Sequence, residues 1–151
     1  MPLDYVWRLL LAAGLGAVLG VEREYRRKPA GLRTNILIAI GSCLLTILSL
    51  EMTKGVADTS RVAGQIVTGI GFLGGGAILR NRDTVHGMTT AATIWVNAAI
   101  GIAAGTGQYA LASATTVLTL VVLVLLPPIE IYFERRAGWS ERHHPPGDRQ
   151  G

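Results

Sequence analysis

The sequence predicts an all-α, polytopic membrane protein with five transmembrane helices, an external N-terminus and a cytoplasmic C-terminus. Half of the 151 residues are hydrophobic, 16% are charged, and the mean hydropathy is +0.40. The charged residues gather in short clusters between long apolar stretches, and most Lys and Arg fall on one side of the resulting topology. This composition excludes an intrinsically disordered chain and is unlike that of an ordinary soluble domain.

Each apolar stretch contains about 16–18 residues, which gives ~24–27 Å of helix and is slightly short of a ~30 Å hydrocarbon core. Flanking residues can extend each span, and Tyr5, Trp7 and Tyr109 stand at positions typical of interfacial anchors. A soluble bundle is the alternative, but it needs charged outer faces, and these stretches are apolar or small all round. The predicted spans are residues 5–21, 35–50, 62–79, 88–105 and 109–126, followed by a short cytoplasmic tail, residues 127–151.

The first and last spans have particular signals at their ends. Asp4 lies where a signal peptide carries its basic region, and no small-residue cleavage site precedes the charged loop, so we expect the first span to be retained. We expect the fifth span to end at Pro127 and Pro128, because proline lacks an N–H donor and breaks a helix.

The distribution of Lys and Arg predicts the orientation. Cytoplasmic loops of membrane proteins carry an excess of these residues. Eleven of them follow the first, third and fifth spans, which places these segments in the cytoplasm, and three lie on the other side. The eleven are Arg23, Arg26, Arg27, Lys28, Arg33, Arg80, Arg82, Arg135, Arg136, Arg142 and Arg149, and the three are Arg8, Lys54 and Arg61.

Small residues recur at helical spacing in every span. Because lipid supplies no hydrophobic force between helices, close backbone approach has to supply the packing. Three spans contain a G-x-x-x-G pattern, which indicates either the packing surface of a tight bundle or a dimer interface or sliding seam. We expect a leucine at Gly71 to break the helix packing. The three pairs are Gly16/Gly20, Gly71/Gly75 and Gly101/Gly105.

The predicted membrane interior is poor in acidic side chains. A Mg²⁺ path usually uses hard oxygen ligands, most often carboxylates, whereas this chain offers Gln65, Thr68 and Asn97 at depth. These side chains can line an ion path, but hydrogen bonding between helices explains them better.

The cytoplasmic edge carries most of the polar chemistry. Helix N-termini with hydroxyls and nearby arginines suit an anionic group, so one interpretation is a site for an anion or a protein partner. The other is that the arginines reach inner-leaflet phosphates and that Glu22 pairs with one of them. The candidates are Glu22, Arg23, Arg33, Thr34, Arg80, Thr89 and Thr90.

The sequence lacks the residues that several classes of functional site require. The sequence contains no nucleophile–base pair and no paired carboxylates, so we expect no enzymatic activity. Gly69, Gly71 and Gly74 match G-x-G-x-x-G but lie inside an apolar span, so we expect no dinucleotide cofactor. The single Cys43 excludes an intramolecular disulfide and a cysteine-built zinc site, and we expect no metal centre. Basic loops beside membrane helices explain the pI near 9.7, so we expect no nucleic-acid partner.

Three long blocks stand out: G-V-E-R-E-Y-R-R-K-P-A-G-L-R-T (20–34), G-I-G-F-L-G-G-G-A-I-L-R (69–80) and G-M-T-T-A-A-T-I-W-V-N-A-A-I-G (87–101). In these blocks, and in their order, the chain resembles the MgtC/SapB family of bacterial inner-membrane proteins up to about Leu126. It departs at Gly75, where Ala is expected, at Met88, where Leu is usual, and at Asn35, where His is common. Without the soluble cytoplasmic domain that many members add, it looks like a short, membrane-only form.

The resemblance implies a non-enzymatic inner-membrane protein linked to magnesium homeostasis, to growth at low magnesium and to virulence through survival inside host cells. It also implies action on other membrane proteins, including the ATP synthase. A small transporter or channel for Mg²⁺ or another ion is the alternative. We expect contacts with membrane lipids and with a membrane-protein partner, with a homo-oligomer as a further option.

Overall fold

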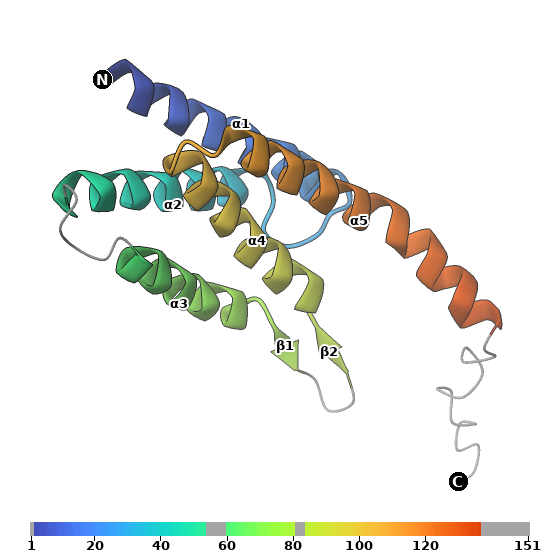
Figure 1. Cartoon of the computed structure of the whole chain (residues 1–151). Coiled ribbons are helices and arrows are strands. Elements are labelled where there is room, and N and C mark those ends of the chain that lie inside the picture. Colours follow the sequence, from blue (N-terminus) through green and yellow to red (C-terminus); the bar gives the residue numbers. More distant parts are fainter. Residues whose placement is uncertain (1, 54–59, 81–83, 137–151) are drawn as a thin grey trace, which may run out of the picture. The chain divides into compact units, whose positions relative to one another are not determined.

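The computed structural model describes residues 2–53, 60–80 and 84–136, which fold into five helices and one short hairpin (Figure 1). Residues 137–151 of the predicted tail lie outside the described part. The chain forms two compact units, Met1–Thr119 and Leu120–Gly151, and α1 to α4 belong to the first. The elements are α1 (Pro2–Tyr25), α2 (Leu32–Thr53), α3 (Ser60–Gly76), β1 (Leu79–Arg80), β2 (Val85–His86), α4 (Met88–Gly105) and α5 (Tyr109–Arg136), with β1 and β2 antiparallel.

The predicted class, an all-α membrane protein, is confirmed by the helices themselves. Four of the described helices are long and apolar enough to cross a membrane, namely α1, α2, α4 and α5. The remaining helix, α3, has 17 residues, which is ~25 Å of helix. Whether α3 also crosses depends on the directions of its two neighbours.

Contacts between α2 and α4 give those directions. Gly101 of α4 lies against Ala39 of α2, and one turn later Gly105 lies against Cys43. Residue numbers rise together along the two helices, so α2 and α4 run parallel. The chain between them therefore has to return through the same thickness, and α3 is the helix that makes this return.

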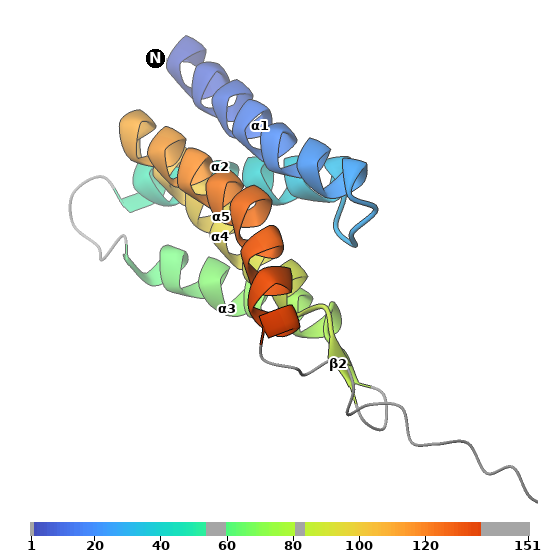
Figure 2. The same ribbon diagram turned by 90° about the vertical axis from the view of Figure 1, so that its right-hand side faces the viewer.

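The outer helices of the first unit run antiparallel to their partners. Gly20, late in α1, lies against Leu32 at the start of α2, and Gly74, late in α3, lies near Ala91 at the start of α4. Figures 1 and 2 show α1 and α3 on opposite sides of the α2–α4 pair. The pair is thus the centre of the first unit.

A buried apolar cluster joins three helices. Ile38 of α2, Ile66 of α3 and Ile94 of α4 form its core. Val62 and Ile70 pack against it from α3, and with Ile66 they recur every four residues on one helix face. The other faces of α3 are therefore left for other contacts.

The end of α3 differs from the prediction, which placed residues 62–79 in one helix. α3 ends at Gly76, and the β1–β2 hairpin follows. Three consecutive glycines, 74–76, weaken the helix here, because glycine loses the most backbone freedom when it is ordered. Gly87, which lies between β2 and α4, has a φ of 92°. A Cβ at this position would overlap the carbonyl oxygen of Ala77.

α5 also differs from the prediction that it ends at Pro127 and Pro128, because the helix continues to Arg136. Each proline removes one N–H donor, but its fixed φ is compatible with a helix. In membrane helices such breaks are tolerated because neighbouring groups satisfy the freed carbonyls. α1 and α2 extend past their predicted spans as well, since flanking polar residues continue the helical backbone.

We predict that α3 crosses the membrane, so that the loops at the two ends of the α2–α4 pair face opposite sides. Cys43→Ala removes the one cysteine of the chain and provides a background for labelling in spheroplasts with a membrane-impermeant thiol reagent. We expect Gln108→Cys to be labelled in intact spheroplasts and Lys28→Cys only after lysis. Equal labelling of both positions before lysis would show that α3 does not cross.

Candidate functional site

Two fully buried asparagines form the polar centre of the bundle. Asn97 of α4 donates from Nδ2 to the backbone carbonyl of Asn35 at 2.7 Å and to its Oδ1 at 3.2 Å. Asn35 donates from its own Nδ2 to the carbonyls of Ala30 and Gly31, which precede α2. One chain of hydrogen bonds therefore ties the middle of α4 to the first turn of α2 and to the basic loop.

Two features of this hydrogen-bond network are energetically unfavourable. The Oδ1 atom of Asn97 is buried and accepts no hydrogen bond from the described residues. Ala30 has a φ of 57°, a left-handed conformation that costs an L-residue roughly 1–2 kcal/mol. The bond from Asn35 to the Ala30 carbonyl helps to hold that conformation.

Two of the predicted G-x-x-x-G pairs lie in tight contact with α2. A Cβ atom on Gly16, Gly101 or Gly105 would stand 2.8, 2.5 or 2.8 Å from a backbone carbonyl oxygen of α2. A Cβ on Gly20 would stand 2.7 Å from the α-carbon of Leu32. The four glycines thus allow α1 and α4 to approach the backbone of α2, as small residues do in membrane bundles.

The third pair, Gly71 and Gly75 of α3, faces open space. Among the described residues no atom from elsewhere lies within 4 Å of a Cβ placed at either position, and the same holds for Gly64. α3 packs on the bundle through a different face, which carries Ile66 and Ile70. A leucine at Gly71 therefore meets no packed neighbour among the described residues, which does not support the expectation that it breaks the helix packing.

The predicted intramembrane polar residues are not brought together. Gln65 and Thr68 are exposed on α3, and the Thr68 hydroxyl donates to the carbonyl of Gly64 in the same helix at 2.9 Å. Asn97 is buried and bonds to α2. Within the described residues no hydrogen bond joins Asn97 to either of the other two, and the buried Asn97 differs from them in exposure.

α1 ends in a charged cluster formed by Glu22, Arg23 and Arg26. Arg23 donates from Nε to Oε2 of Glu22 at 2.6 Å and from Nη2 to Oε1 at 3.0 Å. The Nε atom of Arg26 lies 2.8 Å from Oε1 of Glu22. Glu22 and Arg23 are 9% and 3% exposed, and an unpaired charge is very costly at such burial. Glu22 is therefore already neutralised within the chain.

The other predicted residues of the cytoplasmic edge do not join the charged cluster. No hydrogen bond or ion pair within the described residues connects them to Glu22 or Arg23. The edge thus carries separate polar groups. Thr90 is buried, whereas the exposed members are Arg33, Thr34, Arg80 and Thr89.

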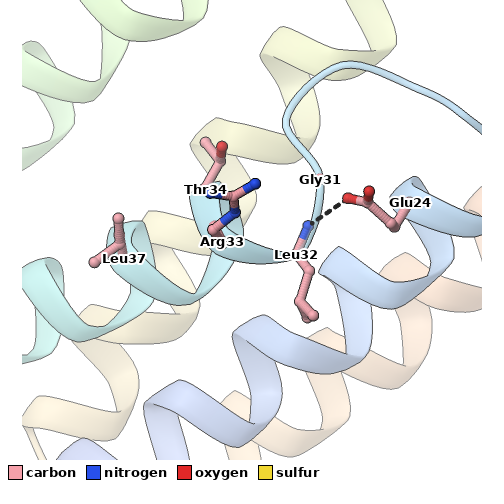
Figure 3. A pocket seen from close by; sticks show the side chains of 6 residues that line it. All are labelled: Glu24, Gly31, Leu32, Arg33, Thr34 and Leu37. Carbon is pink, nitrogen blue, oxygen red and sulfur yellow. Dashed lines mark hydrogen bonds between the residues drawn. The ribbon is translucent and has the colours of Figure 1, made fainter.

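A pocket of ≈ 450 Å³ opens between the end of α1 and the start of α2 (Figure 3). The Oε2 atom of Glu24 accepts a hydrogen bond from the backbone N–H of Leu32 at 3.2 Å, which caps α2. Figure 3 shows Arg33 and Thr34 projecting from the first turn of α2. The pocket is lined by Glu24, Gly31, Leu32, Arg33, Thr34 and Leu37.

A second polar cluster, at the other end of α1, was missed in the sequence. Arg8 donates from Nη1 to the carbonyl oxygen of Gly105 at 2.7 Å and pairs with Asp4 at 2.6 Å. The hydroxyl of Tyr109, at the start of α5, donates to Asp4 at 3.2 Å. The i,i+4 spacing of Asp4 and Arg8 was the signal that could have found the pair. The described residues contain no group of three or more His, Cys, Asp or Glu that could hold a metal ion.

The profile of the MgtC family matches residues 9–132. An uncharacterized protein of Haemophilus influenzae is 43% identical over 139 residues, which cover 86% of this chain and 58% of that protein. YhiD of Escherichia coli, a proposed magnesium transporter by name, is 45% identical over 130 residues, or 82% of this chain and 60% of YhiD. The MgtC protein of Salmonella typhimurium is 46% identical over 122 residues, or 81% of this chain and 52% of MgtC.

The chain therefore spans between half and two thirds of the length of these relatives. No solved structure matches the chain. The family match extends from α1 into α5, so the buried asparagines, both occupied glycine pairs and the charged cluster all lie inside it.

We predict that leucine has different effects on stability at the three G-x-x-x-G pairs. Gly16→Leu and Gly101→Leu should lower stability by ~3 kcal/mol or more, because a bulky side chain is forced against the backbone of α2. Gly71→Leu should retain the wild-type Tm, since its Cβ meets open space. Thermal unfolding in detergent, followed by circular dichroism, compares the three. A Gly71→Leu variant as unstable as Gly16→Leu would contradict the packing described for α3.

Proposed function

The chain belongs to the MgtC family, and we propose that it is a non-enzymatic protein of the bacterial inner membrane that serves magnesium homeostasis by contacting other membrane proteins. The name of YhiD refers to magnesium transport, which supports the link to this ion. We extend the proposal to growth at low magnesium and to survival inside host cells. The basic cytoplasmic edge, where Arg80 is exposed, is suited to contacts with the phosphate groups of inner-leaflet lipids.

The open face of α3 carries this proposal. Gly64, Thr68, Gly71 and Gly75 form an exposed stripe on a helix that is mostly apolar. Stripes of this kind admit a second helix at close range in a membrane, and the other two glycine pairs of this chain each contact α2. We infer that a helix of a partner protein packs on this face. The ATP synthase is a candidate partner, and a second copy of the chain is the alternative.

Ion transport is the second candidate function, and one observation favours it. The Oδ1 atom of Asn97 is an acceptor inside the bundle that the described residues leave without a donor, and polar atoms at membrane depth often mark ion or proton pathways. Against it, Gln65 and Thr68 lie on the exposed side of α3, away from this atom.

We predict that the purified protein in proteoliposomes does not conduct Mg²⁺. A Mg²⁺-sensitive dye inside the vesicles should report the same rate as empty vesicles, provided that circular dichroism shows the protein to be folded. Flux above that rate, lost in Asn97→Ala, would establish the transport function instead. Flux that persists in Asn97→Ala would place the path elsewhere.

We predict that Gly71→Leu abolishes cross-linking to the partner while the chain stays folded. Photo-cross-linking in membranes, with a probe on α3 and identification of the adducts by mass spectrometry, measures this. Gly14→Leu is the matched control, because Gly14 is also exposed with open space at its Cβ but lies on α1. The proposed surface is wrong if the two variants lose the same adducts, or if neither loses any.

A further inference from the structure

The pocket between α1 and α2 has features that the proposed function does not use. It lies where two apolar helices end, between Glu24 in the last turn of α1 and residues 31–37 at the start of α2 (Figure 3). Both helices are long enough to cross a membrane, so their ends lie at the level of the lipid headgroups. A ligand in this pocket is therefore within reach of membrane phospholipids.

The pocket carries one charge of each sign, and neither is neutralised within the described part of the chain. Glu24 and Arg33 are both exposed, and no ion pair to a described residue involves either. Glu24 uses Oε2 to accept the N–H of Leu32, which leaves Oε1 for another donor. The hydroxyl of Thr34, beside Arg33, makes no hydrogen bond to a described residue. This contrasts with the charged cluster on the same turn of α1, where Glu22 is bound by two arginines.

Two of the residues that line the pocket are apolar. Leu32 and Leu37 line it, and Leu37 is 68% exposed. Leu37 comes four residues after Arg33, so it lies ~6 Å further along the α2 axis, on the membrane side of Arg33. Arg33 and Thr34 therefore lie nearer the headgroup level than Leu37, as the polar headgroup of a phospholipid lies outside its acyl chains.

We propose that this pocket binds the headgroup of a zwitterionic aminophospholipid, of which phosphatidylethanolamine is the simplest example. The phosphate lies on the Arg33 guanidinium and the Thr34 hydroxyl, because arginine binds phosphate oxygens through charge-assisted hydrogen bonds. The ammonium group donates to the Glu24 carboxylate, and the first part of an acyl chain follows Leu37. The headgroup of phosphatidylglycerol gives Glu24 no cation, and choline gives it no N–H donor.

Native mass spectrometry of the detergent-purified full chain tests this directly. Phosphatidylethanolamine, its N-methylated and N,N-dimethylated forms, phosphatidylcholine and phosphatidylglycerol are added one at a time with matched acyl chains. We expect phosphatidylethanolamine to be retained about fivefold better than phosphatidylcholine, the scale of one exposed charged contact. Retention should fall with each added methyl group. This series needs no variant and cannot be affected by misfolding.

Variants then assign the two charges. Glu24→Gln keeps an oxygen for the Leu32 N–H and should remove the preference for ethanolamine over choline. Arg33→Gln should weaken the retention of both lipids, whereas Arg80→Gln, an exposed arginine outside the pocket, should change neither.

Three results would overturn the proposal. Equal retention of phosphatidylethanolamine and phosphatidylcholine by the wild-type chain removes the role of Glu24. Stronger retention of phosphatidylglycerol, increased further by Glu24→Gln, makes the pocket a simple anion site. Competition by soluble glycerophosphoethanolamine at the concentration of the lipid itself shows that the acyl chain contributes nothing and that the ligand is not a lipid.

Discussion

The hydrogen bonds of Asn35 hold together parts of the bundle that apolar attraction cannot hold. Lipid tails are as apolar as the helices, so a helix gains little by exchanging lipid for a neighbour of the same character. The side-chain amides of Asn35 and Asn97 have four N–H donors between them, and all four are bonded. These bonds fix the position of α4 along the axis of α2, and they hold the loop between α1 and α2 against the first turn of α2. The contact of Gly101 with α2 then follows, because this glycine can meet the α2 backbone closely only at that register.

The charged groups add constraints at the two ends of α1. The charged cluster closes its last turn, with Arg23 almost fully buried against Glu22. At the first turn, Arg8 donates to the last carbonyl of α4, a favourable position because a helix C-terminus carries partial negative charge. α1 is therefore joined to the end of α4 and the start of α5 by hydrogen bonds of Arg8 and Asp4, and to α2 by the close backbone contacts of Gly16 and Gly20. α3, in contrast, is held within the described residues mainly by one apolar face.

Much of this arrangement could be predicted from the sequence, and the exceptions have physical reasons. Long apolar runs identify spans well, and the predicted range 88–105 coincides with α4. The β1–β2 hairpin has strands of two residues, too short for any alternation to indicate them. The role of Asn35 was missed, because an asparagine near a helix start is most often a capping residue. The three G-x-x-x-G pairs look alike in sequence, yet two of them contact α2 and the third contacts no other described helix. The pattern indicates that a helix can approach closely, but it does not identify which helix lies there.

The shortness of α3 has a consequence for the surrounding bilayer. α3 has 17 residues and α2 has 22, so their lengths differ by ~7.5 Å. A membrane that matches α2 is too thick for α3, and the mismatch costs a fraction of a kcal/mol per Å unless the leaflets bend inward. Around α3 the bilayer would then carry a shallow dimple. Any other protein with a short helix relieves its own deformation by moving into this dimple, so membrane elasticity alone would concentrate such proteins beside the open face of α3, before any specific contact forms.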